Sequence, residues 1–264
     1  MDFLKRSLAP ISDTAWEMIT EEAQDVFHAQ MTARRFVDVT DPKGWDHAAE
    51  PLGRLDVKTD PEADDVGFGV HRVLPLIEVR VPFEFDVWEL DNASRGAKDV
   101  DLDPLVQAAQ KLVAFEESAI YYKHAEAGIV GLKHASDYKT KSIPSVNAQI
   151  PNVVDEGISE MVKNGIGGPY SLIVGPKHWR DITSYADGYP LNKHLKDSIG
   201  GTILLCPAIT EMFLVSERGG DFLLTLGGDI SIGYETHDAK TVRLFFTESF
   251  TFRVIEPKAV VAFK

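Results

Sequence analysis

Residues 215–254 read VSERGGDFLLTLGGDISIGYETHDAKTVRLFFTESFTFRV. Short β-rich runs separated by Gly-rich and Asp-rich turns predict strands over Phe222–Leu226 and Ile230–Tyr234, followed by one longer strand. We expect the long strand to have one apolar face, made of Val242, Leu244, Phe246, Phe250, Phe252 and Val254. The opposite face should be polar and carries Arg243, Thr247, Ser249, Thr251 and Arg253. No convergent set of catalytic side chains accompanies these strands. The segment therefore favours a protein that pairs backbone and presents surfaces.

The composition sets the broad class. The chain has 264 residues, 44% hydrophobic and 26% charged, which is ordinary for a globular core of one large or two modest domains. A net charge of −14 disfavours binding to nucleic acid or to anionic membrane surfaces. The single cysteine, Cys206, excludes an intrachain disulfide framework. We expect it to be a small buried hydrophobe, because a catalytic thiol would need a base beside it.

Neither a secretory signal nor a membrane span is predicted. The N-terminal MDFLKRSLAPIS contains no long apolar run, and no stretch approaches the ~20 apolar residues of a spanning helix. We therefore expect a cytoplasmic protein.

Two long amphipathic helices are predicted. Ser12 or Asp13 can cap the first, which should run to about Arg35, and the dipeptide Asp103-Pro104 should open the second, which should run to about Ala127. The apolar stripe of the first helix needs a partner, either the sheet of the same subunit or another molecule.

An arm and an edge strand are predicted between the two helices. Residues 40–69 are rich in Asp, Pro and Gly, with a short strand at Gly53–Lys58, which indicates an extended arm or hairpin. Apolar and polar residues then alternate from Ile77 to Val87, and Pro82 places this strand at a sheet edge or a bulge. Long strands with an open edge favour pairing between chains.

The middle of the chain alternates helices and strands. Strands are predicted at Tyr170–Val174 and Thr202–Cys206, with helices near Val153–Lys163, His178–Ser184 and Leu191–Asp197. This pattern indicates an α/β subdomain inserted between two β-rich parts.

Motifs of catalytic sites are lacking. The sequence contains no GxSxG, HExxH, P-loop or GxGxxG motif, and the spacing of His124 and His134 fits no standard metal site. Asp60, Glu62, Asp64 and Asp65 are most simply a solvated loop tip, although paired carboxylates for hydrolysis stay open. We predict no catalytic residue and no metal site.

Six blocks of sequence, in order and spanning nearly the whole chain, resemble an encapsulin shell protein. They are MDFLKRSLAPIS (1–12), KGWDHAAEPLG (43–53), LPLIEVRVPFEFDVWELDN (74–92), GPYSLIVGP (168–176), SERGGDFLLTLGGDISIGYE (216–235) and FTESFTFRVIEP (246–257). The resemblance implies an α+β fold like that of tailed-bacteriophage major capsid proteins, with a peripheral domain, an axial domain and an extended loop.

The resemblance also implies a division of the chain. Residues 1–45 would form the N-terminal helix and the start of the peripheral domain, and 46–76 the extended loop. Residues 77–131 would continue the peripheral domain with its long spine helix, 132–214 would form the axial domain, and 215–264 would return to the peripheral domain.

The implied function is that of a structural shell subunit without catalytic activity. About sixty copies would close into an icosahedral nanocompartment. A cargo enzyme, such as a dye-decolourising peroxidase or a ferritin-like protein, would be held inside by a terminal targeting peptide. Such a cargo would connect the shell to iron storage or the oxidative stress response.

Three sets of residues follow from the resemblance. Cargo binding on the inner wall is implied for Phe27, Met31, Arg34, Ile230, Ile232 and Tyr234, for which simple core packing is the alternative. Lining of a pore is implied for Asp187, Gly188 and Tyr189, which could equally be an ordinary surface turn. A flavin (FMN), which the shell would not require, could contact Trp88, Arg80 and Tyr189, although a Trp at a subunit contact explains Trp88 equally well. The alternative function is a flavin-dependent redox enzyme or a hydrolase.

Overall fold

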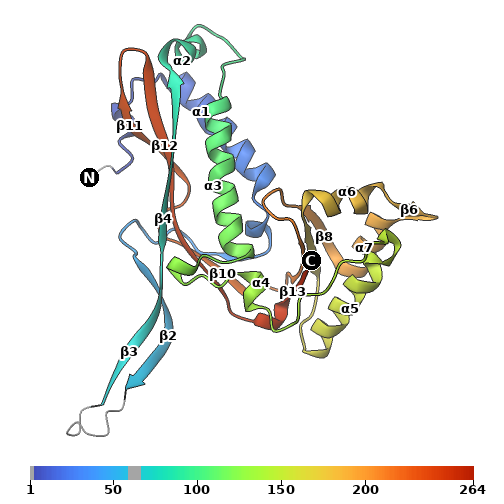
Figure 1. Cartoon of the computed structure of the whole chain (residues 1–264). Helices are drawn as coiled ribbons and strands as arrows, with labels where there is room; N and C mark the ends of the chain where they lie inside the picture. The colour runs from blue at the N-terminus through green and yellow to red at the C-terminus, as the bar shows by residue number, and fades with distance from the viewer. Residues whose placement is uncertain (1–2, 59–66) are drawn as a thin grey trace.

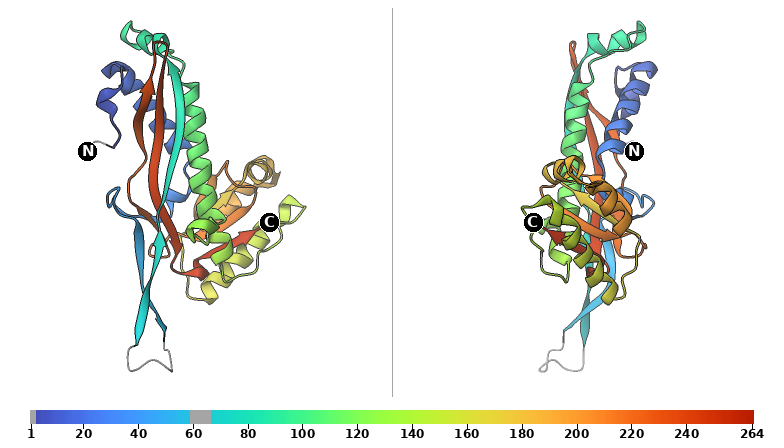
Figure 2. Two further views of the ribbon diagram at one scale, coloured as in Figure 1. Left: turned by 60° about the vertical axis from the view of Figure 1, so that its left-hand side comes forward. Right: turned by 90° about the vertical axis from the view of Figure 1, so that its right-hand side faces the viewer.

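The computed structural model describes residues 3–58 and 67–264. Figure 1 shows an elongated body in which long strands lie beside a long helix, a more compact unit at one side of its lower end, and a two-stranded arm that projects away. The turned views in Figure 2 show that the body is narrow and that the arm continues its long direction.

β12 (Thr241–Val254) is the longest strand and organises the sheet of the body. The sheet runs in the order β1 (Asp38–Val39), β10 (Phe222–Leu226), β12 and β11 (Ser231–His237), and β4 (Ile77–Asp86) also pairs with β12. Within the described residues β4 pairs with no other strand, which confirms the edge position predicted from Pro82. The predicted polar face of β12 is wrong in part. Thr247, Ser249 and Thr251 are buried, because both faces of the strand are covered over this length.

Helices α1 (Asp13–Gln30) and α3 (Asp103–Tyr121) pack against each other and, with α2 (Val87–Ser94), close one core over the sheet. Ser12 caps α1 as predicted, since its hydroxyl accepts the N–H of Ala15. The apolar stripe of α1 therefore lies largely on the subunit's own sheet, where the ring of Phe27 packs edge-on against Phe246 with centroids 5.3 Å apart.

Both long helices end earlier than predicted. α1 stops at Gln30 instead of Arg35, because the carboxylate of Glu117 accepts the N–H groups of Thr32 and Ala33, which a continued helix would bond internally. α3 stops at Tyr121 instead of Ala127, because the chain reverses through backbone hydrogen bonds between His124 and Ile129.

Trp88 does not continue the strand before it. The side chain of Asp86 accepts the N–H groups of Trp88 and Glu89 and so begins helix α2 at Val87. The predicted strand to Val87 is therefore one residue too long, and Trp88 lies in the first helical turn with 70% of its surface exposed.

The compact unit is built on a second sheet of four strands. Their order is β13 (Val260–Phe263), β9 (Met212–Ser216), β5 (Tyr170–Val174) and β8 (Gly200–Leu205), and helices α5 (Ile150–Lys163), α6 (Pro176–Ser184) and α7 (Leu191–Ile199) accompany it. The alternation of helices and strands agrees with the sequence prediction. One strand departs from the predicted division, in which residues 215–264 return to the first body: β13 pairs with β9 in this second sheet.

The arm is an antiparallel hairpin of β2 (Ala49–Lys58) and β3 (Phe68–Pro75). Its strands are longer than the predicted Gly53–Lys58, and Gly53 has φ +65° at a register shift, a backbone conformation that suits glycine. Large apolar side chains are exposed on both strands, namely Leu55, Val57, Phe68, Val70 and Val73. The acidic positions 60, 62, 64 and 65 lie outside the described residues.

Short elements connect these parts. They are η1 (Arg6–Leu8), η2 (Ala33–Arg35), η3 (Ala125–Ala127), α4 (Leu132–Ala135), η4 (Asn147–Gln149), β6 (Ala186–Asp187), β7 (Tyr189–Pro190) and η5 (Pro257–Ala259). In the part of the chain that the structure describes, no helix has the length and apolarity to cross a lipid bilayer. The same residues contain no group of three His, Cys, Asp or Glu side chains placed to hold a metal ion.

Candidate functional site

A groove of about 380 Å³ opens where α1 ends and the turn before β11 passes. Its lining is mixed, with apolar side chains beside charged ones: Gln24, Phe27, His28, Met31, Arg34, Arg35, Asp229 and Ile230. Four residues singled out from the sequence meet here, because the early end of α1 turns Met31 and Arg34 towards the loop that carries Ile230. The groove therefore brings together four of the six residues for which cargo binding was predicted.

The other two predicted members lie away from the groove lining. Ile232 is buried in the core beneath α1. Tyr234 packs partly on that core, and its hydroxyl is 2.6 Å from Nδ1 of His237 while its backbone N–H donates to the carbonyl of Leu4. Ile230 precedes the first residue of β11, so the strand predicted over Ile230–Tyr234 begins one residue too early.

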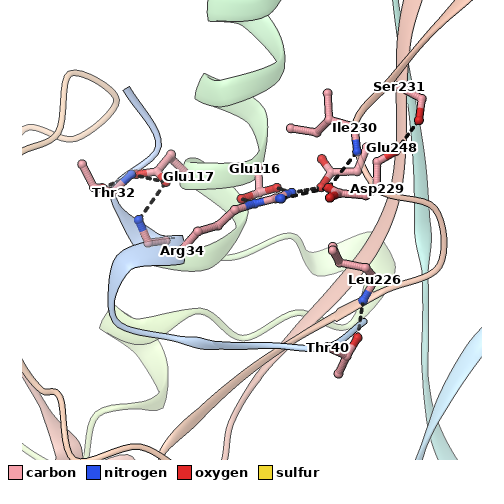
Figure 3. Close-up of polar contacts among 11 residues, drawn as sticks. Thr32, Arg34, Thr40, Glu116, Glu117, Leu226, Asp229, Ile230, Ser231 and Glu248 are labelled. Carbon is pink, nitrogen blue, oxygen red and sulfur yellow. Dashed lines mark hydrogen bonds and ion pairs between the residues drawn. The ribbon is translucent and has the colours of Figure 1, made fainter. Parts of the chain in front are cut away.

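Arg34, one of the lining residues of the groove, binds three carboxylates (Figure 3). Its Nε and NH2 donate to the two oxygens of Glu116 at 3.0 and 2.7 Å, and NH1 donates to Asp229 at 2.9 Å. NH2 also donates to Glu248. The side chains of Glu116 and Glu248 are fully buried, so this arginine compensates charge that water cannot reach.

Glu117 makes a second buried cluster on the other side of the same helix turn. One oxygen accepts the N–H groups of Thr32 and Ala33, and the other accepts the hydroxyl of Thr32 and the thiol of Cys206, which is 3.2 Å away. The segment after α1 is thus held to α3 by two neighbouring glutamates. Arg34, which binds Glu116, also reaches Glu248 of β12, and Glu117 links the segment to Cys206, the residue after β8.

Burial controls the protonation of these groups. It raises the pKa of Glu248 well above its ordinary value, and the charge of Glu116 adds to this, although Arg34 acts in the opposite direction. Burial also raises the pKa of Glu117 and that of the Cys206 thiol, the latter to about 12. Cys206 is therefore a buried, protonated thiol, as expected from the sequence, and does not have the character of a nucleophile.

We expect Glu248→Gln to flatten the pH dependence of stability. Because the pKa of Glu248 is higher in the folded state than in the unfolded chain, the protonated acid stabilises the fold. This contribution to stability is fully present below the unfolded-state pKa of 4.5, and it is lost as pH rises through the folded-state pKa. Gln resembles the protonated acid and does not titrate. Thermal unfolding from about pH 5 to pH 8 should therefore show a steeper decline for the parent than for the variant.

The exposed Glu235, which pairs with Arg243, provides the matched control. Glu235→Gln should leave the pH profile parallel to that of the parent. Parallel profiles for Glu248→Gln and the parent would contradict the assignment.

The three residues of the predicted flavin contact lie on separate parts of the chain. Trp88 is on α2 at one end of the body, whereas Tyr189 is on the β6–β7 hairpin at the far side of the compact unit (Figure 1). The guanidinium of Arg80 already lies over the ring of Phe245, 4.1 Å from its centroid. These residues form no common pocket within one chain, so they do not fit an isoalloxazine ring there.

The predicted pore residues occupy the tip of the β6–β7 hairpin. Gly188 turns the chain with φ +73°, and the exposed Tyr189 donates its hydroxyl to Asp197 at 3.2 Å. That contact raises the pKa of Tyr189. Figure 1 shows this hairpin at the outer end of the compact unit, where another molecule can approach it.

Sequence reasoning missed the buried carboxylates that hold the groove together. Glu116 and Glu117 fall at helical spacing on the apolar stripe of α3, after Leu112 and Val113, and Glu248 interrupts an apolar run in β12. The available signal was a charged residue at a position where the pattern predicts the core. Such residues are almost never buried without partners, so each one indicates a buried ion pair or hydrogen bond.

Known proteins match this chain over nearly its whole length. The family model described as encapsulating protein for peroxidase matches residues 1–251. The type 1 encapsulin shell protein of Mycolicibacterium paratuberculosis is 40% identical over 264 residues, covering 99% of this chain and 98% of the relative. That of Mycobacterium tuberculosis is 38% identical over 264 residues and covers 99% of each chain.

Solved structures share the fold at low sequence identity. A virus-like particle from Pyrococcus furiosus aligns with a TM-score of 0.67 and 17% identity, over 94% of this chain and 99% of its own. A chain from Mycobacterium phage Bobi aligns with a TM-score of 0.60 and 12% identity, over 89% and 90%. The α+β, phage-capsid-like fold predicted from the sequence is confirmed.

Proposed function

The chain belongs to the encapsulin shell protein family, and we propose from this membership that its copies close into an icosahedral compartment that holds a cargo enzyme. One observation carries the proposal: relatives named as shell proteins match this chain from end to end. The exposed apolar arm supports it, because side chains such as Val57 and Phe68 find no cover within one subunit.

Closure follows from repeated contacts of one kind. Heterologous contacts whose rotations close give a finite shell, and the smallest icosahedral shell uses about sixty copies. Many modest contacts acting together make the closed particle far more persistent than any single pair of subunits.

Electron microscopy and analytical ultracentrifugation of the purified protein test the proposal. We expect uniform, round, hollow particles of about sixty subunits. Recovery of monomers or dimers alone, across ordinary salt and pH, would rule it out.

The groove at the end of α1 is the proposed cargo site. It combines an apolar surface of Phe27, Met31 and Ile230 with polar groups along its rim, the combination that binds a short peptide by side-chain pockets and fixes its orientation. Arg34, which also lines the groove, is held in place by its contacts with Glu116, Asp229 and Glu248. A targeting peptide at one end of a peroxidase or a ferritin-like protein would dock here, and iron or peroxide chemistry would then belong to the cargo.

Ile230→Asp is expected to abolish cargo capture without preventing particle assembly. A carboxylate in the centre of the groove removes apolar contact and must be desolvated when a peptide binds. Co-expression with a natural cargo, followed by mass spectrometry of purified particles, should show a loss of at least about tenfold in cargo per shell. Val162→Asp, a change at an exposed apolar residue of α5, is the matched control and should retain cargo. Equal cargo content in both variants would exclude the groove as the docking site.

The β6–β7 hairpin is the proposed pore lining. Copies of Asp187, Gly188 and Tyr189 gathered around a symmetry axis would form a ring, and a ring of carboxylates attracts cations and repels anions. This arrangement would suit passage of metal ions to an enclosed enzyme within the cytoplasm.

A flavin role is the weaker proposal. Since Trp88, Arg80 and Tyr189 form no pocket in one chain, a flavin site built from them would require neighbouring copies. Purified particles that carry flavin absorbance, lost on Trp88→Ala, would support it.

A further inference from the structure

A second groove, of about 540 Å³, lies where the root of the arm meets the end of β12. Its lining comes from β2 and β3, from the loop after η3 and from the residues around the end of β12. Apolar side chains form most of it, among them Leu52, Leu74, Val130 and Ile255. Among the described residues no acidic side chain belongs to the lining, whereas three arginines do, namely Arg54, Arg72 and Arg253. In a chain of net charge −14, the groove is therefore a local positive site on an apolar bed.

Two of these arginines lie directly opposite each other on the arm. Arg54 of β2 and Arg72 of β3 are partners in the register of the hairpin, and both line the groove, so their side chains leave the same face. Directly opposed residues of an antiparallel pair have Cβ atoms about 5 Å apart, and like charges at this spacing destabilise the pair. The hairpin thus holds two positive charges together at a free-energy cost that an anion between them would remove.

The guanidinium groups of the groove have spare donors. Arg72 donates through Nε to Asp56 at 2.6 Å, but both side chains are exposed, and such a pair contributes little to stability. In the described part of the chain Arg54 forms no ion pair, and the buried Nε of Arg253 has no hydrogen-bond acceptor. A buried donor without an acceptor costs free energy, and a carboxylate can accept from a guanidinium through both of its oxygens.

The apolar bed narrows the class of anion. An inorganic ion such as phosphate would use the guanidinium groups and leave the leucine and valine side chains beside them uncovered. The volume of the groove falls in the range of sites for small organic molecules, which are mostly apolar and contain a few placed polar groups. A carboxylate attached to a hydrocarbon body would use both parts of the lining.

We propose that this groove binds a carboxylate with an apolar body, such as a medium-chain fatty acid. The carboxylate lies between Arg54 and Arg72, and the hydrocarbon body covers the apolar side chains beside them. The site shares no residue with the groove at the end of α1. It goes beyond the proposed shell function and does not depend on whether copies of the chain assemble.

Isothermal titration calorimetry with decanoate tests the site. The purified protein should bind decanoate at one site per chain. Arg54→Glu should weaken binding at least about tenfold, because it removes one cation and places a carboxylate opposite the other. Arg180→Glu, at an exposed arginine of α6 outside the groove, is the matched control and should bind as the parent does. No binding by the parent, or equal affinities of the parent and Arg54→Glu, would overturn the proposal.

A pair of valine variants tests the apolar bed. Val130 in the groove and Val146 outside it are exposed to nearly the same extent, 53% and 52%. Val130→Asp should lower the affinity for decanoate about tenfold, because it replaces apolar contact by a charge of the same sign as the ligand. Val146→Asp should leave the affinity unchanged. Equal affinities of these two variants would exclude the groove as the binding site.

Comparison ligands define the chemical class. Acetate and inorganic phosphate lack the hydrocarbon body, and decyltrimethylammonium carries an alkyl chain of similar length with a positive charge. None of the three should displace decanoate at equal concentration. Displacement by phosphate would indicate an anion site without apolar recognition, and displacement by decyltrimethylammonium an apolar groove without a role for the arginines. Either result would contradict the assignment.

Thermal unfolding separates a lost site from a misfolded variant. Decanoate should raise the unfolding midpoint of the parent by mass action and should not raise that of Arg54→Glu. Without ligand, the midpoint of Arg54→Glu should be no lower than that of the parent, because an attractive cross-strand pair with Arg72 replaces a repulsive one. A lower midpoint would show that Arg54 stabilises the fold, and the like-charge argument for a bound anion would fail.

Discussion

Replacing Arg34 with Met is expected to lower the free energy of unfolding by about 3–5 kcal/mol, a large part of the stability of a domain. The substitution keeps apolar volume but leaves Glu116 and Glu248 buried without a cation, and releases Asp229 from its contact. Denaturant unfolding followed by tryptophan fluorescence measures the loss. One subunit concentration must be used throughout, because assembly stabilises the folded state by mass action.

Arg243→Met is the matched control, because Arg243 also forms an ion pair, with Glu235, but at an exposed position. It should cost no more than about 1 kcal/mol. Adding Glu116→Gln and Glu248→Gln to Arg34→Met should recover part of the loss, because neutral groups tolerate burial better than unpaired charges. Equal costs for the two arginines would show that the buried cluster has no special role in stability.

Removal of the arm should abolish the particle while the subunit still folds. The N–H of Leu76 donates to the carbonyl of Ala48 at 3.0 Å, so residues 49–75 can be replaced by a two-residue Asn-Gly turn that joins adjacent chain ends. The arm's strands pair with each other and lie largely outside both apolar cores, so most internal packing survives.

Size-exclusion chromatography with light scattering should find monomers or small oligomers in place of the shell, with a far-ultraviolet circular dichroism spectrum typical of a folded subunit. The control keeps the arm and changes Val146, an exposed apolar residue of the compact unit, to Ser, which should assemble normally. Shells of normal size from the shortened chain would show that contacts elsewhere are sufficient for closure.

Local patterns predicted most elements of the fold. Alternation found β4, helical spacing found α1 and α3, and Tyr170–Val174 was located to the residue. These signals are short in range, and a helix or strand expresses them before it contacts anything else.

The misplaced boundaries have distant causes. α1 ends where Glu117, 85 residues away from Thr32 in the chain, takes the amide protons that would extend the helix. Similarly, β13 lies in the second sheet because it pairs with β9, a strand that is distant in the sequence. The sequence of residues 260–263 alone does not specify which strand β13 pairs with. Propensity gives way to tertiary contact at such points.

The groove at the end of α1 shows both what local sequence patterns predict and what depends on distant contacts. Phe27 lies on the core-facing side of α1, whereas Met31 and Arg34 reach the groove only because the helix stops. The buried glutamates beneath it could have been suspected from their place on an apolar stripe. Their pairing with Arg34 depends on the approach of three separate elements, which one sequence does not reveal.

The buried charge cluster has a consequence for inheritance. Any lineage that replaced Arg34 alone would leave the two acids Glu116 and Glu248 buried without their cation, and one that neutralised both Glu116 and Glu248 would retain a surplus cation held only by the half-exposed Asp229. Substitution at one of these positions is therefore tolerated only after or together with change at another. The three codons, far apart in the gene, form a single unit under selection, and homologues should keep the set intact or exchange it as a whole.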